Sequence, residues 1–188
     1  MANNKVEFGI SNLHVGTYTV ADDGTITMGS PYHQKGAVSF SPEQDSSSNP
    51  FYADDITYWN EYTEGEFSGD LVVAKFDDDF KKNFLGYKSL VDGGLAKVKG
   101  AVKPAVYVAF EIKGDAEKRR VIFYNCSFGA ITREYTTIED TKTPNTETLP
   151  ITISGDNASG VMQTTYRPED AGYDDLFTDP AAPELESE

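Results

Sequence analysis

The chain has 188 residues, a hydrophobic content of 38%, an aromatic content of 12% and a formal net charge of −15 at pH 7. This length suits one domain with a substantial core and is short for two ordinary domains. The acidic balance disfavours binding to nucleic-acid phosphates, which depends on Lys and Arg displacing counterions. No apolar run approaches the ~20 residues of a membrane-spanning helix, and no basic region followed by an apolar segment predicts a secretory signal.

The first strands are expected near the N-terminus. In HVGTYTVADDGTITMG, residues 14–29, two strand-like runs flank an Asp-Gly pair that supplies the positive φ of a tight turn. Another strand is expected around Val38. Residues 41–50, SPEQDSSSNP, hold no core-forming residue and are predicted to form a long polar loop. We predict that residues 41–60 are mobile in the free chain and become ordered against a neighbouring molecule.

Residues 51–76 combine aromatic side chains with acids. One interpretation is a strand whose aromatic side chains point alternately inward and outward, because such residues fit a pleated surface. The other is a surface that contacts a second molecule. The aromatic residues predicted to make such contacts are Phe51, Tyr52, Tyr58, Trp59 and Tyr62.

One segment, DDDFKKNFLGYKSL at residues 77–90, has the spacing of a helix rather than of a strand. The residues that recur on one helix face are Phe80, Phe84 and Tyr87. The three Asp residues stand where a helix N-terminus favours negative charge, and Gly86 is well placed to end the helix. Lys81 and Lys82 are expected to face outward. Helix capping is preferred to a calcium loop, because the ligand spacing of such a loop does not follow.

The second half of the chain predicts a hairpin and a further strand. In VYVAFEIKG, residues 106–114, apolar residues alternate with a period of two, which is typical of a strand with one face on a core. After the turn residues GDAEK, residues 119–129 are expected to form the return strand. The residues expected on one side of it are Ile122, Tyr124, Cys126 and Phe128. A Thr-rich connection then leads to a half-buried strand that contains Leu149, Ile151 and Ile153.

No catalytic, cofactor-binding or metal-binding site is predicted. Cys126 is the single cysteine and is expected to be a buried, inert thiol. His14 and His33 have no Ser or Cys in a nucleophile motif beside them and are expected at the surface or at a strand edge. The carboxylates are numerous, but no pair is marked as a glycosidase pair. An enzyme is therefore the least favoured class of protein.

The composition changes toward the C-terminus. The last 20 residues contain eight acids and no Lys or Arg, whereas the first 168 contain 23 acids and 16 bases. We expect one β domain over residues 1–168 and an acidic tail over residues 169–188 that is solvated and forms no core element. The alternative is that Tyr173, Leu176 and Phe177 dock this tail on the domain.

Three segments occur in a recognisable order: FLGYKSLVDGGLAKVKGAVKPAVYVAFEIKG, KRRVIFYNCSFG and EYTTIEDTKTPNTETLPITISG. With the N-terminal NKVEFGISNLHVGTYT, they resemble the major tail proteins, or tail tube proteins, of long-tailed phages that infect Gram-positive bacteria. In that family an LGY…DGG segment after a helix precedes a hairpin, a Thr-rich connection and a strand. The resemblance covers residues 4–155, and its motifs are structural.

The resemblance implies a mainly β fold, sandwich-like or barrel-like, with one short α-helix packed on the sheets. It implies a structural virion protein that forms hexameric rings through exposed strand edges, with the rings stacked into a tail tube. The implied partners are further copies of the chain, a tape-measure protein, and tail terminator and distal tail proteins. Phage DNA would pass through the lumen without specific binding, and no membrane or cofactor is involved. The protein would be synthesised in the host cytoplasm and reside in the phage tail.

The alternative function is a soluble β-sandwich module that binds a carbohydrate or a protein through the aromatics around Trp59. In a tube, the acids expected to face the lumen or a subunit contact are Glu61, Glu64, Glu66, Asp70 and Glu111. Six copies at −15 each carry about −90, which repels DNA of the same sign and opposes ring closure. Added salt is therefore expected to ease assembly.

Overall fold

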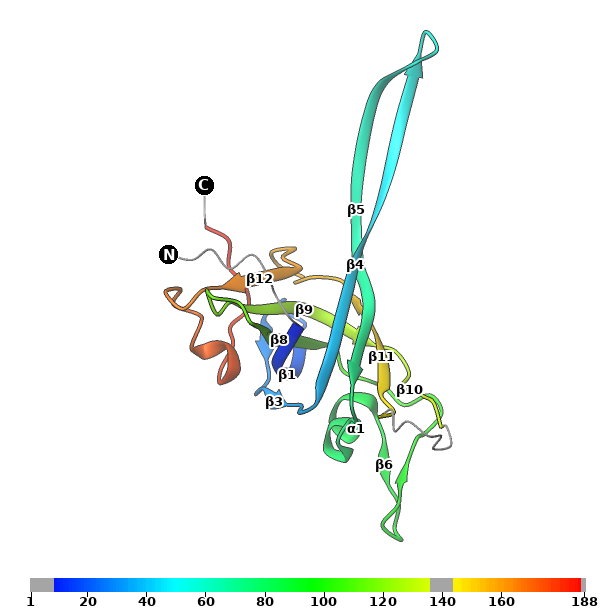
Figure 1. Ribbon diagram of the computed structural model, residues 1–188, viewed down its shortest axis with the longest axis vertical. Coiled ribbons are helices and arrows are strands. Elements are labelled where there is room, and N and C mark those ends of the chain that lie inside the picture. The colour runs from blue at the N-terminus through cyan, green and yellow to red at the C-terminus, as the bar shows by residue number, and fades with distance from the viewer. Residues whose placement is uncertain (1–8, 136–143, 187–188) are drawn as a thin grey trace.

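The computed structural model describes residues 9–135 and 144–186 (Figure 1). The described part is mainly β, with one α-helix, α1 (Asp78–Leu85), and one 3₁₀ turn, η1 (Asp175–Phe177). The predicted mainly β fold with one short helix is confirmed. The predicted Thr-rich connection falls largely on residues 136–143, which lie outside the described residues.

The strands are β1 (Gly9–Val20), β2 (Ile26–Met28), β3 (Tyr32–His33), β4 (Ala37–Ala53), β5 (Ile56–Val73), β6 (Lys88–Ser89), β7 (Leu95–Ala96), β8 (Val106–Lys113), β9 (Arg120–Phe128), β10 (Thr132–Arg133), β11 (Glu147–Ile153) and β12 (Gln163–Tyr166). The predicted strands around the Asp-Gly turn are β1 and β2, which pair antiparallel. The strand expected around Val38 is the start of β4.

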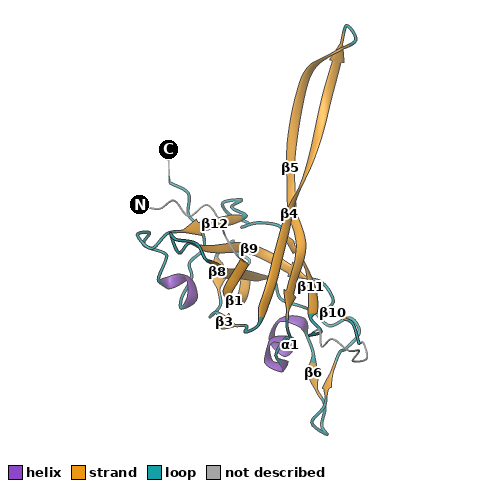
Figure 2. Ribbon diagram, in the orientation of Figure 1, coloured by secondary structure: helices purple, strands orange, loops and turns teal. Residues whose placement is uncertain are grey.

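Ten strands form one antiparallel sheet with the main order β2-β1-β8-β9-β11-β5-β4 (Figure 2). β3, β10 and β12 pair with β1, β11 and β9 outside this order, and β6 and β7 form a separate ribbon. The sheet curls on itself. The ring of Phe40 on β4 lies edge-on to Phe110 on β8, at 5.8 Å between centroids, and to Phe123 on β9, at 5.3 Å. The curled sheet therefore encloses a barrel-like core.

The main core lies inside this curl, and α1 packs against it. Phe80 of α1 stacks on Phe76 with ring centroids 4.8 Å apart and lies 5.9 Å from Phe128 of β9. Strand residues buried in the same core include Leu71, Val73, Val106, Val108, Leu149, Ile151 and Ile153. The alternation predicted for the last three of these is confirmed by their burial on β11.

The helix is confirmed between Asp77, which has extended backbone, and Gly86, which ends it in the left-handed region with a φ of 70°. Lys82 is exposed as expected. Lys81 instead turns toward the body, where its Nζ lies 3.4 Å from Oε1 of Glu147. The outward orientation predicted for Lys81 is wrong, because a carboxylate buried on β11 is stabilised by a neighbouring cation.

The hairpin of β8 and β9 is confirmed, but both of its faces are buried. β9 has a bulge at Asn125, which has a φ of 49°. Beyond this bulge, the side chains of β9 point to the opposite faces from those that strict alternation would give. Val106 pairs with Cys126 and Val108 with Phe123, so β9 contains one extra residue between these pairs. The single face predicted for β9 is wrong, since an inserted residue shifts the alternation. Beyond the bulge, Cys126 and Phe128 lie in the main core, whereas Ile122 and Tyr124 lie in a second cluster.

Cys126 is fully buried, as predicted, and burial raises the pKa of its thiol. A buried neutral thiol is a poor nucleophile, because the thiolate is the reactive form.

The second apolar cluster lies on the other side of β8 and β9, and the C-terminal segment covers it. The buried residues of this cluster are Tyr107, Ala109, Ile122, Tyr124 and Leu176. The guanidinium of Arg120 lies 3.9 Å from the ring centroid of Tyr173 and 4.4 Å from that of Phe177, and its Nη1 donates to the Tyr173 carbonyl at 2.6 Å. The expected solvation of the acidic tail is wrong for this stretch. The docked alternative through Tyr173, Leu176 and Phe177 is confirmed.

His14 is also buried by this segment, with 8% of its surface exposed. Its ring stacks between His33, at 4.8 Å, and Phe177, at 4.4 Å. Burial lowers the pKa of His14, while its Nδ1 lies 2.9 Å from the Asn12 carbonyl oxygen. The surface position predicted for His14 is wrong, whereas His33 is exposed as expected.

Candidate assembly interface

β4 and β5 extend beyond the rest of the molecule as a two-stranded hairpin (Figure 1). β5 also pairs with β11, but only from Phe67 to Val73. Beyond the Gln44–Phe67 pair, β4 and β5 pair only with each other among the described residues. We call residues 45–66 the arm. At a strand rise of ~3.3 Å per residue, the arm reaches roughly 30 Å past that pair.

The arm contradicts the long polar loop predicted for residues 41–50. Ser41 pairs with Asp70 and Asn49 pairs with Glu61, so this stretch is regular strand. Its backbone pairs with β5, and beyond Gln44 its side chains are exposed on both faces. A strand with no buried face has no reason to alternate apolar and polar residues, which is why the sequence pattern of a strand is missing.

The hairpin turns at Asp54 and Asp55, which have φ values of 52° and 61°. Positive φ at both central residues is the conformation that two-residue hairpin turns favour, and Asp tolerates it better than most residues. The pair before the turn is Ala53–Ile56. The turn therefore fixes the register of the arm at its tip.

The predicted aromatic contact residues all lie on this arm and are exposed. Their exposed fractions are 59% for Phe51, 64% for Tyr52, 74% for Tyr58, 51% for Trp59 and 71% for Tyr62. Phe51 pairs directly with Trp59, so these two share one face, while Tyr62 lies three residues from Trp59 on the opposite face. Exposed apolar patches of this kind mark interaction surfaces. Because the aromatic residues occupy both faces of the arm, they do not form the single flat surface that the alternative binding module requires.

The predicted acids divide between two places. Glu61, Glu64 and Glu66 are exposed on the arm, and Asp70 is exposed where β5 enters the body. Glu111 is not brought to them. It is half-buried on β8, where its Oε1 lies 3.1 Å from Nε of Arg120. The acids of the arm are Asp45, Asp54, Asp55, Glu61, Glu64 and Glu66, and residues 45–66 contain no Lys, Arg or His.

The base of the arm is anchored in the main core. Phe67 lies 6.0 Å from Phe123, which also contacts Phe40. Gly69 sits where β4 crosses closely, and a Cβ there would collide with the Ser41 carbonyl. This packing holds the first residues of both strands, so the direction of the arm is set by the body.

Sequence analysis did not single out a second exposed apolar group around β6 and β7. Its members are Leu90, Val91, Val98 and Val102, with exposed fractions of 51%, 111%, 46% and 91%. We call residues 88–102 the ribbon. The available signal was the Asp-Gly-Gly turn at residues 92–94 between two short apolar runs, which is typical of a hairpin.

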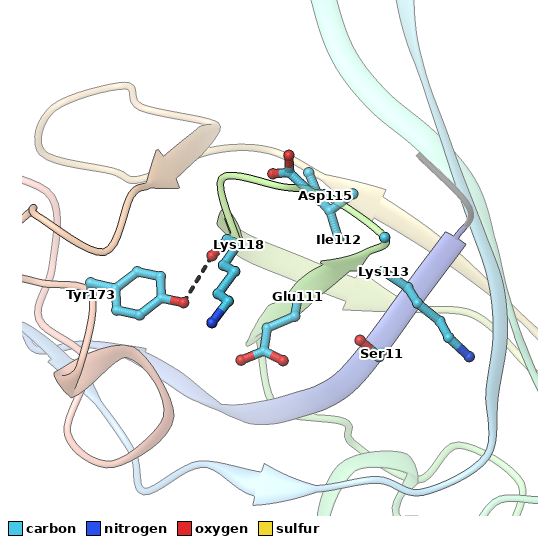
Figure 3. Close-up of a pocket in the computed structure, with 8 residues that line it drawn as sticks. Ser11, Glu111, Ile112, Lys113, Asp115, Lys118 and Tyr173 are labelled. Carbon is cyan, nitrogen blue, oxygen red and sulfur yellow. Dashed lines mark hydrogen bonds between the residues drawn. The ribbon is translucent and has the colours of Figure 1, made fainter. Parts of the chain in front are cut away.

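A shallow, open pocket of about 290 Å³ lies between the β8–β9 turn and the C-terminal segment (Figure 3). Tyr173 donates its hydroxyl hydrogen to the Lys118 carbonyl at 2.8 Å across it. Asp115 lies 2.7 Å from Nε of Arg119, and this hydrogen bond lowers the pKa of Asp115 to about 2. The Tyr173–Lys118 hydrogen bond joins the hairpin turn to the C-terminal segment, and the Asp115–Arg119 pair lies within the turn itself.

Within residues 9–135 and 144–186, no three His, Cys, Asp or Glu side chains are grouped so that they could hold a metal ion. No helix in the same residues is long and apolar enough to cross a membrane.

The family model for phage tail tube proteins matches residues 1–173, and the chain belongs to this family. Among solved structures, the chain is similar to one from the cryo-EM structure of the anti-feeding prophage cap, described as a tube-terminating cap. The two share 10% sequence identity over 89% of this chain and 99% of that chain, with a TM-score of 0.37. A comparison with curated proteins finds no match. The predicted membership of the phage tail tube family is confirmed, and the protein is a structural component of the phage tail. The Gram-positive host stays a prediction.

Proposed function

We propose that the protein assembles into hexameric rings that stack into the tail tube, enclose a tape-measure protein and conduct phage DNA. The basis is its membership of the phage tail tube family, which matches nearly the whole chain. In a closed ring each subunit presents one surface to the next, and a second contact propagates rings into a filament. Tail terminator and distal tail proteins would close the two ends of such a tube.

The observation that carries the proposal is the arm. It exposes aromatic side chains on both faces and places no residue in the core of its own subunit. An isolated two-stranded hairpin is marginally stable in water. A neighbouring subunit would supply the burial that the arm lacks. We therefore assign the five predicted aromatic residues to contacts between subunits, and the exposed acids of the arm to the same contact or to the lumen.

Strand edges support the ring contact. β4 and β2 are the outermost strands of the main strand order. Each therefore has one edge that pairs with no other strand in that order. Exposed edge N–H and C=O groups can pair with the edge of another chain. Joining such edges around a ring would extend six curled sheets into one wide barrel with an open channel.

The test is negative-stain microscopy of the purified protein at high concentration, with light scattering to measure mass. We expect rings or tubes. Hydrogen exchange should show fast exchange of arm amides in the free subunit and slower exchange in the assembled protein. Compact monomers alone, both with and without a tape-measure protein, would contradict the proposal.

A further inference from the structure

We propose that the arm of one copy docks on the ribbon of the next copy along the tube, through opposite charges around exposed apolar side chains. This inference rests on the proposed tube function and names the two surfaces of its stacking contact. The occupant of both surfaces is a second copy of this chain.

The two surfaces lie at opposite ends of the molecule. The arm projects at one end of the longest axis, and the β6–β7 ribbon lies at the other end (Figure 1). A contact between unlike surfaces at opposite ends is head-to-tail, and its repetition produces a filament rather than a closed dimer. The shape of the subunit therefore suits stacking along its long axis.

The charges at the two ends are opposite. The arm carries six acids and no base, whereas residues 81–103 carry six lysines and one acid, Asp92. Of these lysines, Lys88, Lys97 and Lys99 are exposed, and none of the ion pairs found in the described chain includes them. Surfaces of opposite charge attract and set orientation, while like charges placed together are repelled.

The remaining lysines of this region are engaged within the subunit. Lys81 pairs with Glu147, and Lys82 lies 3.6 Å from Asp79. Lys103 donates to the Phe128 carbonyl at 3.0 Å, and burial together with the charge of Lys97 lowers its pKa. Lys88, Lys97 and Lys99 are thus the exposed lysines of this region that form no ion pair among the described residues.

Exposed apolar side chains are concentrated at the same two ends. The arm presents the five aromatics and Ile56, which is 63% exposed, and the ribbon presents Leu90, Val91, Val98 and Val102. An apolar centre with a charged rim is the usual anatomy of a specific interface. Among residues 9–135 and 144–186, these side chains stay exposed at both ends. Each end therefore has both the apolar area and the charge that the other end complements.

The experiment uses two charge-reversed full-length proteins. In the arm variant, Asp45→Lys, Glu61→Lys, Glu64→Lys and Glu66→Lys change the net charge of the arm from −6 to +2. In the ribbon variant, Lys97→Glu and Lys99→Glu change the net charge of the ribbon from +2 to −2. Each variant alone places like charges at every stacking contact. We expect each to need at least about tenfold more protein than the wild type to form tubes. Thermal unfolding should show that both remain folded.

A 1:1 mixture of the two variants is the decisive sample. The reversed arm matches the reversed ribbon, and the unchanged arm matches the unchanged ribbon, so the mixture should form tubes near the wild-type concentration. One matched control carries Glu169→Lys, Asp174→Lys, Glu184→Lys and Glu186→Lys, and the other carries Lys35→Glu with Lys113→Glu. They make the same charge changes as the two variants at exposed sites elsewhere. We expect these controls to assemble alone.

Three results would overturn the inference: an arm or ribbon variant that assembles alone as well as the wild type, a mixture that fails while the controls assemble, or controls that fail as badly as the variants. All three leave the wild-type tube intact and the proposed function standing. A wild-type protein that forms neither rings nor tubes would instead refute the proposed function, and the inference would fall with it.

Discussion

The body and the arm differ in what determines their structure, and β5 runs through both. Leu71 and Val73 near its end are fully buried, whereas Trp59 and Tyr62 are more than half exposed on the same strand. In the body, burial on both sides of the sheet specifies position and register. In the arm, only the turn and the strand ladder specify structure, and the side chains are left for another molecule. The comparison separates residues that fold the subunit from residues that join subunits.

The largest effect on subunit stability is expected for Phe123→Ala. Phe123 contacts Phe40, Phe67 and Phe110 at the base of the arm, so its removal leaves a cavity among aromatic rings. We expect the free energy of unfolding to fall by about 3–5 kcal/mol. Urea denaturation measures it, with Phe51→Ala as the control on the arm. Equal losses of unfolding free energy in Phe123→Ala and Phe51→Ala would contradict the distinction between body and arm.

A smaller loss is expected when the C-terminal segment is loosened. Leu176 is 3% exposed against the second cluster, and Leu176→Ala should lower the free energy of unfolding by about 2–3 kcal/mol. Removal of residues 181–188 is the matched change, because it also alters the C-terminus but spares the docked residues. If Leu176→Ala has no more effect than this truncation, the docked segment contributes nothing to the body.

Lowering the pH should weaken the packing of the same C-terminal segment on the body. Burial lowers the pKa of His14 below its value in the unfolded chain, so the neutral ring is favoured in the folded state. The contribution of the neutral His14 ring to folding stability is present at pH values above the unfolded pKa of 6.5. It is lost as the pH falls through that value toward the lower pKa of the folded state. The nearby charges act in opposite directions, since Glu111 raises the pKa while His33 and Arg120 lower it. Thermal unfolding between about pH 7.5 and about pH 5.5 should therefore show a smaller loss in His14→Gln than in the wild type. A wild-type pH response in His14→Gln would refute this account.

The smallest effect on the free subunit is expected for Trp59→Ala. Trp59 contributes to no buried cluster, so the free energy of unfolding should change by no more than about 0.5 kcal/mol. Tube formation by the same variant should be impaired, because aromatic anchors carry much of the energy of protein interfaces. A stability loss comparable to that of Phe123→Ala would mean that the arm packs on its own subunit.

Sequence reasoning succeeded where one face of an element is buried and failed elsewhere. The spacing of Phe80 and Phe84 predicted α1, and the alternation from Leu149 to Ile153 predicted β11, because each packs one side on the main core. Sequence analysis missed the change of side-chain direction at Asn125, because a β-bulge produces no periodic pattern in the sequence. Apolar periodicity was absent from residues 45–50 because both faces of the arm are in solvent.

The candidate interface was predicted in part. Aromatic and acidic residues in one stretch indicated a contact surface, and the structure brings the aromatic residues and three of the five acids onto the arm. Glu111 could not be separated from the others by sequence, because its pairing with Arg120 depends on the β8–β9 register. The ribbon was missed, since its lysines and apolar residues are unremarkable until the fold shows that they lie opposite the arm.

The central claim is that the arm is dispensable for folding and required for stacking. The direct test replaces residues 45–66 by Asn-Gly, so that the Gln44–Phe67 pair flanks a two-residue hairpin turn. One sample of this variant is examined by thermal unfolding and by negative-stain microscopy. The account predicts a Tm within about 5 °C of the wild type, with single rings or free subunits and no tubes. Tubes of wild-type length from this variant, or a subunit that no longer folds, would contradict it.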